Sequence, residues 1–152
     1  MKILILSVLI SISFNFAQAQ QNADSTAVMA ILEEVFTVCN SASPEGESST
    51  IIIFERLSQY ILYTGNDPVR KNKEACNYDK SDDRKLVDET GLKINKWLDK
   101  IENYNVLKYS NQKQGAMDKH ILKLGYKVKN SNKDITFGFV KIENNFYLIE
   151  IK

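Results

Sequence analysis

Several residues on which protein chemistry commonly depends are scarce in this chain of 152 residues, which contains one histidine, two cysteines and six glycines. A single histidine, His120, cannot supply a histidine pair for a metal. The sequence also lacks a glycine-rich phosphate loop and a nucleophile elbow. These absences exclude the enzyme classes that such motifs define.

An excess of charge of one sign is also lacking, since the whole chain has a formal net charge of +1. Proteins that bind nucleic acid or anionic membranes usually carry a basic excess on one face. The balance therefore argues against a nucleic-acid partner. The hydrophobic fraction of 43% is sufficient for one packed core.

The first residues have the three parts of a secretory signal. Lys2 precedes an apolar run that ends near Phe14, and Ala17-Gln18-Ala19 follows as a small-residue cleavage site. We expect residues 1–19 to be a cleaved signal peptide, 20–23 a flexible leader and 24–152 a single domain. The protein would then be periplasmic or extracellular. The apolar run is shorter than the roughly 20 residues that span a bilayer, so no membrane insertion is expected after cleavage.

Export bears on charge and on the two cysteines, Cys39 and Cys76. Removal of residues 1–19 takes out Lys2 and no acidic residue, which leaves no formal net charge. An even number of cysteines outside the cytoplasm predicts a disulfide between Cys39 and Cys76. The alternative is two separate thiols, with Cys39 at an apolar helix position and Cys76 in a loop.

The first part of the chain has helical periodicity. Apolar residues at helical spacing predict a helix over 24–41 and a second over 50–64, which Gly65 would end. Ser81 is predicted to cap a third helix.

After residue 104 the apolar period changes to two. Strands are predicted at 106–109, 120–128, 135–142 and 146–151. Asn144-Asn145 is the expected turn of the last hairpin. This turn would place Val140, Ile142, Tyr147, Ile149 and Ile151 on one face of the sheet, and Phe137, Phe139, Lys141, Leu148 and Glu150 on the other. Both faces are partly apolar, so one would pack on helices and the other would be covered, bind something or pair with a second subunit.

Helices followed by strands predict an α+β fold, with three N-terminal helices packed on a curved antiparallel sheet of about four strands. The helix from Val28 to Cys39, helices around Phe54 and Trp97, and closing strands at 136–140 and 147–149 resemble the NTF2-like, or cystatin-like, cone. That resemblance implies a pocket between sheet and helices and a homodimer through the outer face of the sheet. Enzymatic members use a carboxylate or an Asp–His pair deep in the cone, and no such pair can be matched to positions of this sequence.

Two groups of residues are candidates for a site. His120 and Glu150 are the candidate catalytic residues, and they would share a face with Lys141 only if the loop at 130–133 has four residues in register. Four aromatic residues are candidates for lining a ligand pocket, although such residues are usually core: Trp97, Tyr126, Phe137 and Phe139.

Two charged stretches have simpler interpretations. Asp79, Asp82 and Asp83 resemble part of a calcium loop but lack its glycine and closing glutamate, so helix capping explains them better. The basic cluster of Arg70, Lys71 and Lys73 is typical of a solvated loop, with anion or partner binding as the alternative. The sequence therefore predicts neither a metal nor a cofactor.

The leading hypothesis is an exported, non-enzymatic binding or interaction domain for a small apolar molecule or a protein partner. Two alternatives stay open: a small pocket enzyme of isomerase or hydrolase type, and an inhibitor or immunity protein against a secreted enzyme or toxin.

Overall fold

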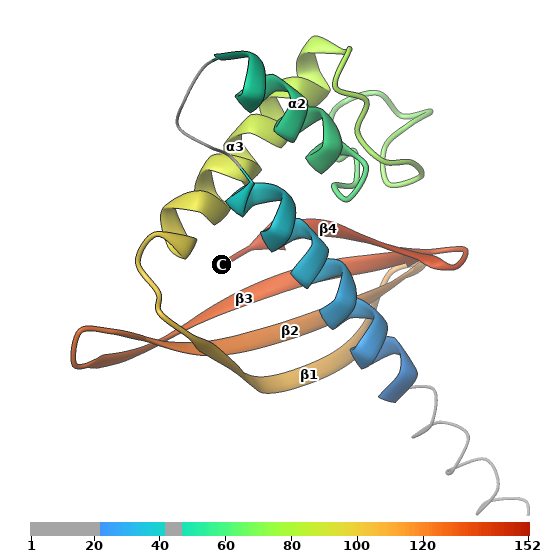
Figure 1. The fold of residues 1–152 in the computed structure, drawn as a ribbon. Coiled ribbons are helices and arrows are strands. Elements are labelled where there is room, and N and C mark those ends of the chain that lie inside the picture. The colour runs from blue at the N-terminus through green and yellow to red at the C-terminus, as the bar shows by residue number, and fades with distance from the viewer. Residues whose placement is uncertain (1–21, 42–46) are drawn as a thin grey trace, which may run out of the picture.

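A computed structural model of the chain describes residues 22–41 and 47–152 and has an α+β architecture (Figure 1). The predicted signal peptide lies outside the described residues. Residues 22 and 23, predicted to be in a leader, already belong to the N-terminal helix. The elements in chain order are the N-terminal helix (22–40), α2 (Glu47–Ser58), α3 (Ser81–Leu98), β1 (Tyr104–Gln114), β2 (Met117–Val128), β3 (Ser131–Ile142) and β4 (Asn145–Ile151).

The four strands form an antiparallel meander in the order β1-β2-β3-β4, as the sequence predicts. Ile142 pairs with Asn145, so the last turn is Glu143-Asn144, one residue earlier than predicted. Glu143 adopts the left-handed conformation there, with a φ of 55°. At the β2–β3 turn Val128 pairs with Ser131, which leaves a loop of two residues instead of four.

The predicted faces of the last hairpin are wrong beyond Leu148, because the register shifts between Gly138 and Phe139, opposite Ile149. Phe139 pairs with Leu148 and Phe137 pairs with Ile151. Paired residues of neighbouring strands share a face, so Ile151 lies with the phenylalanines and not with Val140. The extra residue of a β-bulge has this effect, because it reverses the alternation of side chains beyond it.

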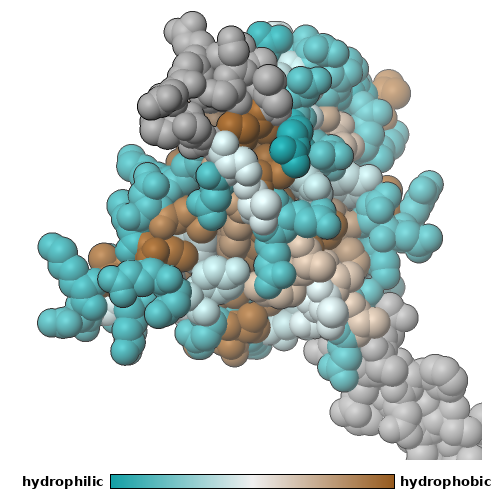
Figure 2. All heavy atoms as spheres, viewed as in Figure 1, coloured by the Kyte–Doolittle hydropathy of each residue, from teal (hydrophilic) through white to brown (hydrophobic). Residues whose placement is uncertain are grey.

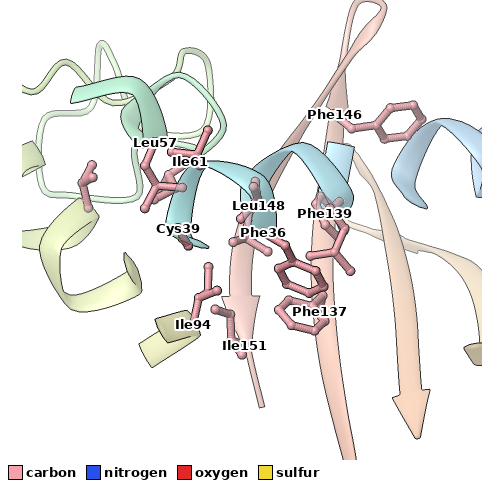
Figure 3. Packing of buried hydrophobic residues seen from close by; sticks show 14 of the residues in the cluster. Phe36, Cys39, Leu57, Ile61, Ile94, Phe137, Phe139, Phe146, Leu148 and Ile151 are labelled. Carbon is pink, nitrogen blue, oxygen red and sulfur yellow. The ribbon is translucent and has the colours of Figure 1, made fainter. Parts of the chain in front are cut away.

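The N-terminal helix lies across one face of the sheet, which curves around it (Figure 1). Its apolar stripe includes Val28, Leu32, Val35 and Phe36, all buried. Phe36 faces Phe137 of β3, with ring centroids 5.6 Å apart (Figure 3). We call this the inner face of the sheet, and it holds the centre of the core.

Helix α2 lies against α3 instead of packing on the sheet as predicted (Figure 1). Gly91 explains how the two helices approach closely. A Cβ atom at Gly91 would lie 2.4 Å from Cε1 of Phe54 and 3.0 Å from Cδ2 of Leu57. The glycine that weakens the helical pattern of α3 is therefore the residue that makes room for α2.

Substituting Gly91 should test this contact. Gly91→Val is expected to lower the free energy of unfolding by about 1–3 kcal/mol, because buried Phe54 and Leu57 must move to accept the side chain. Lys85→Val puts the same β-branched residue at an exposed position of α3 and is the control. Urea unfolding of both variants measures the difference, and equal losses would contradict the packing role.

The predicted second helix stops at Ser58 rather than at 64, and Gly65 does not end it. Tyr60 belongs to the turn that follows the helix, and Ile61 and Leu62 run beside the edge of β4. The Leu62 N–H donates to the Leu148 carbonyl at 3.0 Å, and the Leu148 N–H donates to the Tyr60 carbonyl at 2.8 Å. The other side of this segment pairs with residues 74–76 through Leu62 and Ala75. The edge of β4 is therefore covered at Leu148 by the chain itself.

Candidate functional site

The four aromatic residues predicted to line a pocket are mostly core. Phe137 and Phe139 are fully buried and Trp97 is 6% exposed. The Trp97 ring lies 5.2 Å from Phe36, 5.7 Å from Phe137 and 5.5 Å from Tyr126, centroid to centroid. Such edge-to-face and tilted contacts are typical of packed interiors. These rings fill the space between the N-terminal helix and the sheet.

His120 belongs to a polar cluster at the other end of the inner face. Its side chain is 1% exposed, and its Nδ1 shares a hydrogen bond of 2.6 Å with the Tyr109 hydroxyl. The Phe146 ring meets the imidazole edge-on at 4.9 Å. Asp24 of the N-terminal helix and Lys141 of β3 form an ion pair of 2.8 Å. The cluster therefore joins the start of the helix to all four strands of the sheet.

This cluster keeps its groups neutral or paired. Burial lowers the pKa of His120, an effect that Lys141 reinforces and that Asp24 and Asp118 oppose. Burial, with the Asp24 charge, raises the pKa of Tyr109 to about 12. Nε2 of His120 is buried without a hydrogen-bond partner among the described residues. Solvent does not reach this nitrogen, so a substrate has no access to it in this conformation.

The titration of His120 provides a direct test, because it is the only histidine. The folded protein should show an imidazole NMR midpoint below the ordinary value of about 6.5, and the urea-unfolded chain the ordinary value. The unfolded state then binds the proton more tightly, so stability falls as the pH drops below about 6.5. A midpoint at or above 6.5 in the folded protein would contradict the buried, neutral imidazole.

Glu150, the other candidate catalytic residue, does not join His120. It pairs in register with Gly138 on the opposite, outer face and forms ion pairs with Lys119 and Lys152. To reach Lys119 on β2 its side chain crosses Gly138, where a Cβ would lie 2.6 Å from Cγ of Glu150. Lys141 does share the inner face with His120, so only that part of the predicted grouping is found.

The two cysteines are free in the structure, and the predicted Cys39–Cys76 bond is not formed. Both side chains are buried, and burial raises the pKa of each thiol to about 12. Both thiols are therefore protonated at neutral pH, and a protonated thiol is a weak nucleophile.

The acidic and basic stretches that the sequence treats separately meet in one network. Asp83 is fully buried and accepts hydrogen bonds from Nη1 of Arg70 at 2.9 Å and from Nη2 at 2.5 Å. It also accepts from the Asn77 N–H at 2.6 Å. The guanidinium of Arg70 lies 4.2 Å from the centre of the Tyr63 ring. Asp83 is therefore not a capping residue; Lys80 is the N-cap of α3, and Ser81 makes no side-chain cap.

The feature that sequence reasoning missed is the difference between the two edges of the sheet. β4 is covered by residues 60–62, whereas β1 has only β2 beside it among the described residues. Val106 and Leu107 of β1 are 50% and 53% exposed. A register shift falls between Val106 and Lys108, and from Lys108 to Gln114 the pairing with β2 is regular. The only sequence signal was a strand predicted at 106–109, much shorter than the real one.

A basin of about 370 Å³ adjoins the start of β1. The residues that line it are Asn103, Asn105, Asn132, Lys127, Lys133, Leu107, Gly125 and Tyr126. A Cβ at Gly125 would lie 3.0 Å from the Leu107 side chain, so the glycine lets Leu107 lie over β2.

Within residues 22–41 and 47–152, no helix combines the length and apolar character needed to cross a membrane. The same part of the chain brings together no group of three histidine, cysteine, aspartate or glutamate side chains able to hold a metal ion. No protein-family model matches the sequence, and comparison with curated proteins and solved structures gives no significant match.

Proposed function

We propose that this protein is an exported interaction domain that binds an extended segment of another protein along the open edge of β1. The observation that carries the proposal is a strand of eleven residues, Tyr104–Gln114, at an edge that the described chain leaves uncovered. An open edge offers unpaired backbone N–H and C=O groups to an added strand. The exposed Val106 and Leu107 add apolar surface beside these groups.

The filled interior favours a protein partner over a small apolar ligand. In the alternative that the fold resemblance implies, the ligand would lie between the helices and the sheet. Phe36, Trp97 and Phe137 occupy that space, and their ring centroids lie 5.2–5.7 Å apart. A ligand there would have to displace packed aromatic rings, which contribute much of the stability of a core.

Charge favours a partner other than a second copy of this chain. β1 contains Lys108 and Lys113 and no carboxylate. Pairing of two β1 strands would bring lysines together with no acidic residue to neutralise them, and edge lysines discourage such pairing. A strand with acidic side chains meets no such repulsion, so we expect an acidic extended segment as the occupant.

Selection of random displayed peptides on residues 20–152 tests the proposal. Binding peptides should shift the backbone NMR signals of Tyr104–Gln114 more than those of β4. Asn111→Pro and Gln112→Pro provide matched variants, because successive N–H groups of an antiparallel strand point alternately to the neighbour and outward. One variant should lose peptide binding with little loss of stability, and the other should lose stability.

Two results would overturn the proposal. One is a selection that yields no peptide, and the other is a set of peptides that bind equally well to a stable proline variant. Native mass spectrometry tests the homodimer: a dimer that persists when β1 carries the stable proline would assign self-association to another surface, such as the outer face.

We also infer that the fold is an NTF2-like cone. The supporting observations are the four-stranded antiparallel meander and its curvature around the N-terminal helix (Figure 1). Export is proposed on the signal-peptide pattern at residues 1–19. N-terminal sequencing of the natively produced protein should give Gln20 as the first residue, and retention of Met1 would contradict export by this signal.

A further inference from the structure

The basin at the start of β1 has the chemistry of an anion site. Its polar lining residues are three asparagines, two lysines and Tyr126, and no acidic residue lines it among the described residues. Amide N–H groups and ammonium groups are the donors that carboxylates accept from in proteins. Its volume of about 370 Å³ falls at the lower end of small-ligand pockets, which enclose roughly 300–1,000 Å³.

The hairpin that forms one wall of the basin is locally basic. Residues 126–133 contain Lys127, Lys129 and Lys133 and no acidic residue. The next acidic residue, Asp134, is already paired with Lys123 at 2.8 Å. Hydrophilic side chains gather over the end of this hairpin, which projects from the body of the protein (Figures 1 and 2). The hairpin wall of the basin therefore carries an excess of lysines although the whole chain is nearly neutral, and the nearby acidic residues are Asp134 and Glu102, which precedes Asn103 in the sequence.

The basin is continuous with the open edge. Asn105 and Leu107 belong both to β1 and to the lining. We propose that the basin binds a carboxylate of the segment that adds to β1, with Lys127 and Lys133 as the main recognition charges and half-exposed Leu107 packing against the aliphatic part of that residue. This inference rests on the proposed function and specifies the chemistry of the partner.

The first experiment changes the charges of the peptide and of the basin. A peptide selected on β1 is compared with a version in which its acidic residues are replaced by their amides. The Lys127→Gln/Lys133→Gln double variant should weaken binding of the acidic peptide about three- to tenfold and leave the amide version nearly unchanged. Lys129→Gln, at the tip of the same hairpin and outside the lining, is the control and should have a smaller effect.

The source of the carboxylate is distinguished by the C-terminus of the peptide. If an acidic side chain occupies the basin, the peptide with an amidated C-terminus and the peptide with a free C-terminal carboxylate should bind equally. If a terminal carboxylate occupies it, amidation alone removes the effect of the two lysines. Competition with citrate tests the third source, a free small carboxylate. If the basin binds such molecules, citrate should block the basin, and peptides without acidic residues should still bind β1.

The outcomes separate this inference from the proposed function. Two outcomes would overturn the carboxylate site in the basin and leave the proposed edge binding intact. One is that peptides bind β1 without preference for acidic residues. The other is that Lys129→Gln and the double variant lose equal affinity for the acidic peptide. Titration with N-acetyl-glutamate methylamide tests the basin without strand addition. It should shift the amide NMR signals of Gly125 and Lys127 in the wild type and not in the double variant, and unchanged wild-type signals would overturn the carboxylate site.

Discussion

Replacing Asp83 with alanine should lower the free energy of unfolding by about 3–5 kcal/mol, with a fall in Tm of roughly 10–20 °C. Asp83 is fully buried and accepts two hydrogen bonds from Arg70 and one from the Asn77 backbone. Its loss leaves the Arg70 guanidinium, whose side chain is only 11% exposed, without its main counter-charge. The segment between Tyr63 and α3 then loses its principal anchor.

Two variants sharpen this test. Asp82→Ala changes the neighbouring, exposed carboxylate of the same first helical turn and should cost only about 0.3–1 kcal/mol. Arg70→Met combined with Asp83→Leu removes both charges, and should be more stable than Asp83→Ala, in which the buried Arg70 keeps only its half-exposed partner Glu74. Urea unfolding measures all three. A loss below about 1 kcal/mol for Asp83→Ala would show that the ion pair is not the anchor.

Acid should have a related effect. Burial alone would raise the pKa of Asp83, but the hydrogen bonds from Arg70 and Asn77 outweigh it and the pKa is lowered. A lowered pKa means that the contribution of Asp83 to stability is present above the unfolded-state value of about 3.9 and is lost as the pH falls below it. The stability of the wild type should therefore decline more steeply in this range than that of the Arg70→Met/Asp83→Leu variant.

Phe137→Ala is the second change with a large expected effect, and should lower the free energy of unfolding by about 3–5 kcal/mol. The Phe137 side chain is fully buried and packs against Phe36 of the N-terminal helix (Figure 3). It also packs against Trp97 of α3. Truncation removes the contacts of both rings and leaves a cavity. Thermal and urea unfolding measure the loss, and Phe137→Leu should lose less because it keeps more of the volume.

The same variant distinguishes core from ligand site. If Phe137 lined an empty pocket, alanine would change ligand binding and cost little stability, because few contacts would be lost. A loss below about 1 kcal/mol would therefore restore the hypothesis of an apolar ligand between helices and sheet. Tyr147→Ala, on the outer face of β4, is the control for a residue outside this cluster.

The sequence was informative where periodicity is strong. Helical spacing from Val28 to Cys39 and alternation from His120 to Val128 predicted the N-terminal helix and β2 to within a few residues. The meander followed from short connections between strands. Three of the aromatic residues proposed as pocket lining, Trp97, Tyr126 and Phe137, are in ring contact, but distinguishing a lining from a filled core requires the actual packing.

The remaining features depend on contacts between distant parts of the chain. Ile61 and Leu62 fit a helical pattern, and the free edge of β4 draws them into an extended conformation instead. The bulge opposite Gly138 moved Glu150 away from His120. The isolated glycine within the strand was its only local signal, and a glycine alone does not show on which strand the extra residue falls. Arg70 and Asp83 each have an ordinary surface interpretation, and only the fold pairs them. Local propensity is a weak guide when tertiary partners compete with it.

The pairing of Tyr60 and Leu62 with Leu148 also determines the order in which the chain can fold. The strands of the meander pair with their neighbours in sequence, whereas residues 60–62 pair with a strand that is far away in the sequence. Distant contacts of this kind carry a high closure entropy and form late. We therefore expect the segment from Tyr60 to Leu62 to be among the last parts of the chain to become ordered.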